Sequence, residues 1–237
     1  MSVRAVLFGL AGLVLIPLAG CDREEEPPAA PPPRAWVEQL DESSRGERTA
    51  IELSAEGLRP DHLSALGKGG EAVERITLVD VPQTADREAF DTAWRSVLPS
   101  LPNLRRVTFD GPVSADVFAE AGTPPLTHLN LPAAAMGSSG FRALLAGRPS
   151  LELLRLHAPG VRDEDLAGLA DLPRLRFLHL IDAPLTDAAV PHLAAGPALE
   201  SVYLDRSRLT WEGWEELHRL RPDLHLHADL THPVGGH

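Results

Sequence analysis

The chain has 237 residues with 22 basic and 34 acidic side chains, so its formal net charge is −12. This charge argues against nucleic acid as a partner, because proteins that bind nucleic acid present a basic surface to the phosphates. The single cysteine, Cys21, excludes an intramolecular disulfide framework and any metal site built from several cysteines. A hydrophobic fraction of 43% and a charged fraction of 24% are typical of a globular chain.

The first 20 residues have the composition of a secretory signal. Arg4 provides a positive charge, and residues 5–19 form an apolar run without a charged side chain. This run is shorter than the roughly 20 residues that a membrane-spanning helix needs. It has the length of the apolar region of a signal peptide. We therefore expect residues 1–20 to be a signal peptide.

The segment Leu18-Ala19-Gly20-Cys21 resembles the lipobox of bacterial lipoproteins. In that family the signal is cut before the cysteine, the thiol is diacylated, and the new amine is usually acylated too. The resemblance implies that Cys21 carries the lipid and that the chain lies in the bacterial cell envelope. It would be anchored to the inner or the outer membrane and face the periplasm or the exterior. Each buried methylene contributes about 0.8 kcal/mol, so two or three acyl chains hold firmly.

The segment after the cysteine is rich in acids and prolines. Residues 22–33 read Asp-Arg-Glu-Glu-Glu-Pro-Pro-Ala-Ala-Pro-Pro-Pro, and such a run favours extended polyproline II over packing. We expect residues 21–35 to be a tether that begins at the acylated cysteine. Residues 36–47 are expected to form an N-terminal helical cap, in which Trp36 covers the end of the following repeats.

A repeat occupies most of the remaining chain. Segments close to the pattern Leu-x-x-Leu-x-Leu begin at Leu104, Leu126, Leu151, Leu175 and Leu199. The intervals between them are 22, 25, 24 and 24 residues, and apolar residues at helical spacing follow each segment. The period switches from 2 to 3.6 within each unit, which predicts a short strand followed by a helix. Two weaker copies at 51–53 and 76–78 and a terminal one at 224–226 bring the number of predicted strands to eight.

One longer unit, residues 73–104, has room for a further helix. Residues 86–98 place Phe90, Trp94 and Val97 on one helical face. A doubly wound α/β domain would also alternate strands and helices. Its units usually need roughly 30 residues or more, so intervals near 24 residues favour a solenoid.

The repeats resemble the leucine-rich repeat family, and the resemblance covers residues 48–227. It implies an α/β leucine-rich repeat solenoid, with a parallel sheet on the concave face and helices on the convex face. We assign the solenoid to residues 48–228 and a histidine-containing tail to residues 229–237. The family often has Asn or Cys at the ninth position, and this chain instead resembles the type that lacks the Asn ladder. That position holds Pro112, Ala134, Pro159, Ala183 and Ser207.

Polar residues lie between the buried positions of the predicted strands and therefore point into the concavity. The central row consists of Glu52, Thr77, Thr108, Asn130, Arg155, His179, Tyr203 and His225. Two residues further on, the same face carries Asp110, His157, Asp205 and His227. We predict a binding surface on this face that is formed by Asn130, Arg155, His157, His179, Tyr203, Asp205, His225 and His227.

No catalytic motif emerges, so we expect neither an enzyme nor a cofactor. Gly137-Ser138-Ser139-Gly140 is not a Gly-x-Ser-x-Gly motif, and Gly67-Lys68-Gly69-Gly70 lacks the Ser or Thr of a phosphate loop. The predicted function is a lipid-anchored envelope module that recognises a protein or an envelope polymer through the concave sheet. One alternative is a structural spacer without a specific ligand.

A second alternative is a metal-binding protein of the envelope. Histidine and aspartate suit zinc, nickel or copper, and the candidate ligands lie in the C-terminal repeats and the tail. They are His179, Asp205, His225 and His227, followed by His232 and His237. No tight ligand spacing such as His-Glu-x-x-His is present, so the sequence does not predict a metal site.

Overall fold

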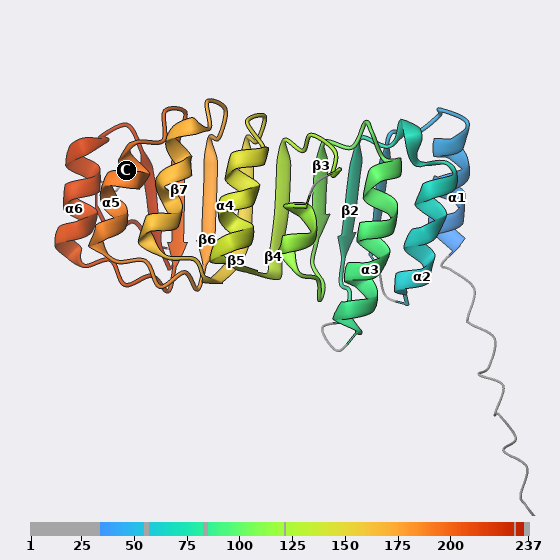
Figure 1. The fold of residues 1–237 in the computed structure, drawn as a ribbon, viewed down its shortest axis with the longest axis horizontal. Helices are drawn as coiled ribbons and strands as arrows, with labels where there is room; N and C mark the ends of the chain where they lie inside the picture. The colour runs from blue at the N-terminus through green and yellow to red at the C-terminus, as the bar shows by residue number, and fades with distance from the viewer. Residues whose placement is uncertain (1–33, 55–56, 83–84, 121, 230, 235–237) are drawn as a thin grey trace, which may run out of the picture. The chain divides into compact units, whose positions relative to one another are not determined.

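Eight strands form a single sheet in the computed structural model, and their order along the sheet is their order along the chain (Figure 1). Every neighbouring pair is parallel. The structure describes residues 34–54, 57–82, 85–120, 122–229 and 231–234. The predicted parallel solenoid is therefore confirmed. The predicted signal peptide, Cys21, nearly all of the predicted tether and His237 lie outside the described residues.

The strands are spaced along the chain at the predicted intervals. They are β1 (Ala50–Ser54), β2 (Arg75–Val79), β3 (Arg106–Phe109), β4 (His128–Gly137), β5 (Leu153–Gly160), β6 (Phe177–Ile181), β7 (Ser201–Asp205) and β8 (His225–Ala228). The α-helices are α1 (Arg34–Ser44), α2 (Pro60–Leu63), α3 (Arg87–Val97), α4 (Ser138–Gly147), α5 (Val190–Ala194) and α6 (Trp211–Leu220). Short 3₁₀ segments complete the connections at 64–68, 70–72, 98–100, 115–118, 163–171 and 187–189. Within the described ranges, no helix has the length and apolar character needed to cross a bilayer.

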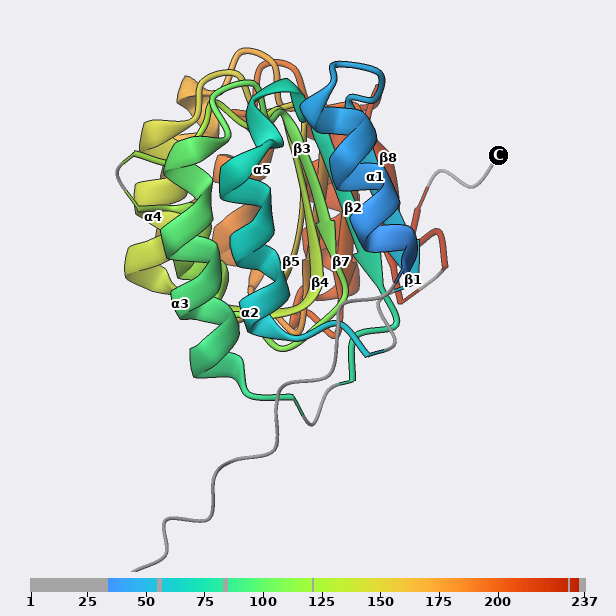
Figure 2. The same ribbon diagram turned by 90° about the vertical axis from the view of Figure 1, so that its right-hand side faces the viewer.

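Alternation along each strand separates the core from the open face. In β6, Leu178 and Leu180 are buried, and His179 between them is only partly buried. The buried side chains pack against the helices, of which α2, α3, α4 and α5 lie on one side of the sheet (Figure 2). We call the other side the open face. Residues in register form one continuous apolar row through the stack: Ile51, Ile76, Val107, Leu129, Leu154, Leu178, Val202 and Leu226.

The helix predicted in the long unit is α3. Its N-cap is Asp86, whose carboxylate accepts a hydrogen bond of 3.1 Å from the backbone N–H of Ala89. Phe90, Trp94 and Val97 are buried, as their helical spacing predicts. The extra length of this unit therefore provides a full helix and its caps.

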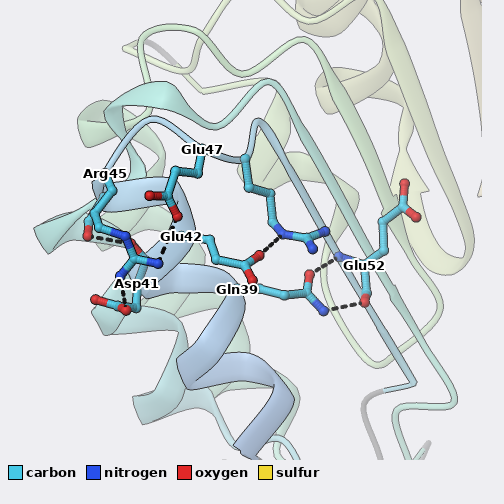
Figure 3. Close-up of polar contacts among 8 residues, drawn as sticks. Gln39, Asp41, Glu42, Arg45, Glu47 and Glu52 are labelled. Atoms are coloured by element: carbon cyan, nitrogen blue, oxygen red, sulfur yellow. Dashed lines mark hydrogen bonds and ion pairs between the residues drawn. The ribbon is translucent and has the colours of Figure 1, made fainter.

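Helix α1 covers the first strand of the sheet. Trp36 is completely buried beneath it. The side-chain amide of Gln39 donates to the carbonyl of Glu52 at 2.9 Å and accepts from the N–H of the same residue at 2.8 Å (Figure 3). The amide thus occupies the place of a neighbouring strand, which matters because an unpaired edge invites pairing with another chain. The segment predicted as the cap, residues 36–47, overlaps this helix.

Aspartates link successive repeats at the starts of their helical segments. The carboxylate of Asp163 accepts hydrogen bonds from the N–H and the hydroxyl of Thr186, both at 2.7 Å. Asp187 accepts from the N–H and the hydroxyl of Thr210 in the same way, both at 2.8 Å. Each aspartate–threonine pair attaches the start of a helical segment to the previous repeat. Each also satisfies a backbone N–H that has no intrahelical partner at a helix start.

The predicted register of the last strand is wrong by two residues. The prediction aligned 224–226 with 202–204, but Val202 pairs with Leu226. Leu224 lies in the turn before the strand and donates its N–H to the carbonyl three residues earlier, as Leu199 does one repeat before. In the last repeat one residue lies between the turn residue Leu224 and the first buried strand residue Leu226. In the repeat before it, two residues lie between Leu199 and Val202. The Leu-x-Leu pair of the last repeat therefore includes a turn residue.

The two histidines of β8 therefore each lie one row away from their predicted positions. His227 lies beside Tyr203 in the central row, and His225 lies beside Ser201. The predicted positions, with His225 in the central row and His227 in the row of Asp205, are therefore wrong.

Candidate functional site

The central row of the open face is formed by eight residues in register. They are Glu52, Thr77, Thr108, Asn130, Arg155, His179, Tyr203 and His227. Residues two positions earlier in each strand form a parallel row on the same face, and this row includes the apolar Leu153 and Phe177. Along the central row the side chains change from the small hydroxyl groups of Thr77 and Thr108 to the large planar rings of His179, Tyr203 and His227.

Three neighbouring rings follow one another along the C-terminal half of the central row, and two of them stack. The ring centroids of His179 and Tyr203 are 5.3 Å apart, and the planes make an angle of 34°. Tyr203 and His227 stack more closely, with centroids 4.2 Å apart and planes within 6° of parallel. Parallel pairing produces this stack, because it places residues in register on adjacent strands about 4.8 Å apart. The stack presents an amphipathic surface of aromatic edges and ring nitrogens.

Two histidines of the open face, His157 and His179, each contact a carboxylate of the next repeat. The Nε2 atom of His179 lies 2.7 Å from Oδ2 of Asp205. A carboxylate only accepts, so Nε2 is the donor and the ring orientation is fixed. His157 makes a similar contact of 2.9 Å with Asp182, which is also ion-paired with Arg206. The guanidinium of Arg206 is the largest cause that holds the pKa of Asp182 below its usual value.

A groove of about 330 Å³ runs beside the stacked rings. Its polar lining comes from the central row, and its apolar lining includes the partly buried Leu153 and Phe177. Arg155 lies in this lining, and its side chain makes no hydrogen bond or ion pair with any residue in the described ranges. The groove thus combines an unpaired cation, a flat aromatic wall and an apolar patch. The residues that line it are Asn130, Leu153, Leu154, Arg155, Phe177, Leu178, His179 and Tyr203.

Three polar atoms of the central row are buried without a partner. They are Oδ1 of Asn130, Nε of Arg155 and Nε2 of His227, none of which is hydrogen-bonded to a residue that the structure describes. A buried polar group without a hydrogen bond costs about 1–3 kcal/mol. Three adjacent or nearby positions of the central row thus carry hydrogen-bonding atoms that a bound partner could satisfy.

The structure brings together four of the predicted binding residues around the groove: Asn130, Arg155, His179 and Tyr203. Asp205 supports the groove through His179. His157, which is in register with Ile181 and Asp205, pairs with Asp182 just after β6. His227 extends the stack, and His225 lies outside it.

The predicted binding surface leaves out the apolar residues of the groove and His232, which the sequence offers only as a candidate metal ligand. Phe177 and Leu153 lie two positions before His179 and Arg155, so the period of two along a strand was the signal that identifies them. His232 is the other omission from the predicted surface. It lies with His225 and His227, and ligand atoms of the three side chains are all within 4.8 Å of one another. Burial, followed by the nearby imidazoles of His225 and His232, lowers the pKa of His227.

Comparison with known proteins gives structural likeness only. No protein-family model matches the chain, and no curated protein matches it in sequence. An internalin from Listeria monocytogenes is similar at 14% identity and a TM-score of 0.47; the match covers 78% of this chain and 55% of the internalin chain. A protein from Bacteroides fragilis is similar at 16% identity and a TM-score of 0.42, with 83% and 69% covered.

A leucine-rich repeat-containing protein from Legionella pneumophila is similar at 15% identity and a TM-score of 0.33, with 76% of this chain and 82% of that chain covered. The assignment of the fold rests on this chain's own register and repeat length. Eight parallel strands in sequential order, separated by helical segments on one side of the sheet, make the region from β1 to β8 a leucine-rich repeat solenoid.

Proposed function

We propose that this chain is a lipid-anchored binding module of the bacterial cell envelope that recognises a partner protein through the groove on its open face. The groove that contains Arg155, Phe177 and Tyr203 carries the proposal. Tyrosine and arginine are the residue types that most often dominate the energy of protein interfaces. An arginine without an ion-pair partner on the chain itself is available to a carboxylate or carbonyl group of the partner.

The rigidity of the sheet supports the same proposal. The groove residues come from adjacent strands in continuous register, and Asp205 fixes the ring of His179. A surface that is already ordered loses little conformational entropy when it binds. The net charge of −12 adds a weak, salt-dependent attraction for basic regions of a partner.

Site-specific crosslinking in cells tests the groove. A photo-crosslinking phenylalanine analogue at Tyr203 is expected to capture a specific adduct, whereas the same analogue at the exposed Glu215 of α6 captures none. Arg155→Ala is expected to reduce the adduct from position 203 at least about fivefold, because truncating an interface hot spot costs more than about 1 kcal/mol.

The matched control is Arg106→Ala, which removes an exposed arginine of the same face outside the groove and is expected to leave the adduct unchanged. A protein partner makes the adduct sensitive to protease. An envelope polymer, the other partner class that the sequence suggests, makes it sensitive to the enzyme that degrades the polymer. Adducts of equal yield from positions 203 and 215, or none at all, would favour a structural spacer.

The anchor is tested separately, at Cys21. The wild-type chain is expected to remain in the membrane fraction and to incorporate a labelled fatty acid, while Cys21→Ser does neither. The neighbouring substitution Asp22→Ser keeps the cysteine and is expected to retain both label and membrane attachment. A wild-type chain that carries no label would contradict the proposed lipid anchor, and the crosslinking result would stand independently of it.

A further inference from the structure

We propose that His225, His227 and His232 together bind one transition-metal ion of the zinc class at the C-terminal end of the sheet. The groove of the proposed function is not required for this site. The metal site consists of two side chains from the last strand, β8, and one from the segment that follows β8.

The backbone brings these three side chains to one place. His225 and His227 are two residues apart on β8, so they point to the same face of the sheet. The chain then reverses: Ala228 and Thr231 exchange two backbone hydrogen bonds of 2.9 and 2.8 Å, and the Thr231 hydroxyl donates to the Ala228 carbonyl at 2.7 Å. This reversal carries His232 back to β8.

The distances fit a metal site. Nε2 of His225 and Nε2 of His232 are 3.3 Å apart. Zinc–nitrogen bonds of 2.0–2.1 Å in a tetrahedral site place two ligand nitrogens about 3.3–3.4 Å apart. The ring of His227 lies 4.4 Å from that of His225 and 4.3 Å from that of His232, measured between centroids. One ligand atom from each of the three side chains lies within 4.8 Å of the other two.

A hydrogen bond between imidazoles is the competing explanation for the short contact between His225 and His232, and it leaves His227 without a role. Nε2 of His227 is buried and hydrogen-bonds to none of the described residues. Tyr203 stacks on this ring at 4.2 Å, and the rings of His225 and His232 lie 4.4 and 4.3 Å from it, measured between centroids. A metal ion would give this buried ring nitrogen a partner.

The donor set selects the class of metal. Three imidazoles suit Zn²⁺, Ni²⁺ or Cu²⁺, whereas Mg²⁺ and Ca²⁺ require oxygen ligands. Three protein ligands leave one tetrahedral position for water or for a group from a partner. The His179–Asp205 pair, which the sequence placed in the same candidate set, is engaged in its own contact of 2.7 Å.

Calorimetric titration of the full chain with Zn²⁺ alone tests the site. The chain is purified without a polyhistidine tag and dialysed against chelator, and a parallel Cys21→Ser preparation removes the only thiol. We expect saturable binding of one Zn²⁺ per chain and no binding of Mg²⁺. His232→Ala is expected to weaken Zn²⁺ binding at least tenfold, since even outer-shell changes cost about 10–100-fold.

His192→Ala, which removes a histidine of α5 outside the cluster, is the matched control and is expected to bind Zn²⁺ like the wild type. Zn²⁺ should also raise the unfolding temperature of the wild type but not that of His232→Ala, because a ligand of the native state stabilises it. This second measurement shows that each variant is folded. Absence of saturable binding, or equal affinities of His232→Ala and His192→Ala, would overturn the site. Arg155→Ala is expected to bind Zn²⁺ normally, so failure of the groove and failure of the metal site are distinguishable.

Discussion

Replacing Trp36 with alanine is expected to lower the free energy of unfolding by about 3–5 kcal/mol, the usual cost of removing a large buried aromatic side chain. Trp36 is fully buried and packs α1 onto the first repeats. Loss of this contact weakens the attachment of α1 and with it the pairing of Gln39 with the edge strand β1. Urea unfolding followed by far-UV circular dichroism measures the loss.

Exposure of the β1 edge adds a second, concentration-dependent effect. We expect Trp36→Ala to self-associate, because an uncovered edge strand pairs with another chain. The neighbouring Val37 is 49% exposed, so Val37→Ala should change stability by less than about 0.5 kcal/mol and leave the chain no more associated than wild type. Light scattering distinguishes the two variants. Equal behaviour of Trp36→Ala and Val37→Ala would show that α1 does not protect the edge.

The second large effect is expected at Trp94, where alanine should cost about 3–5 kcal/mol. Trp94 is completely buried in the long unit. Its ring lies 5.7 Å from Phe109 in an edge-to-face arrangement and 5.4 Å from Phe118. Such aromatic pairs contribute about 0.5–1.5 kcal/mol beyond the area they bury. Equilibrium denaturation in urea gives the difference directly.

Two control variants test whether the stability lost in Trp94→Ala comes from lost packing in the core. Trp211 is 58% exposed on α6, and Trp211→Ala should remain within about 0.5 kcal/mol of the wild type. The indole N–H of Trp94 hydrogen-bonds to no residue in the described ranges, so Trp94→Phe removes no such bond and should cost much less than alanine. A loss for Trp94→Ala no larger than that for Trp211→Ala would contradict the packing argument.

The fold could be predicted because its determinants are local and repeated. Leu178 and Leu180 alternate with His179, and the same alternation returns about every 24 residues, so sheet order and parallel pairing follow from the repeat alone. Asn130, Arg155, His179 and Tyr203 could be placed on one face for the same reason.

The remaining features depend on contacts between repeats or on departures from the repeat. The last repeat has one residue fewer between its turn leucine and its strand than the repeat before it, and His227 therefore lies in the central row. The sequence pattern does not reveal this, because Leu224 in the turn is a buried leucine like those of the strands. His232 reaches β8 only through a chain reversal outside the repeat. The link from Asp163 to Thr186 joins residues in different units, so spacing within one unit gives no indication of it.

The aspartate links between repeats have a consequence for how such a chain can change in length. Asp163 and Asp187 are 24 residues apart, and so are Thr186 and Thr210, the threonines that donate hydrogen bonds to them. A duplicated unit would therefore carry a threonine that donates to the aspartate of the preceding copy. It would also carry an aspartate that accepts from the threonine of the following copy. The array could grow or shrink by whole units while every junction kept its hydrogen bonds, and the extent of the open face would be set by the number of copies.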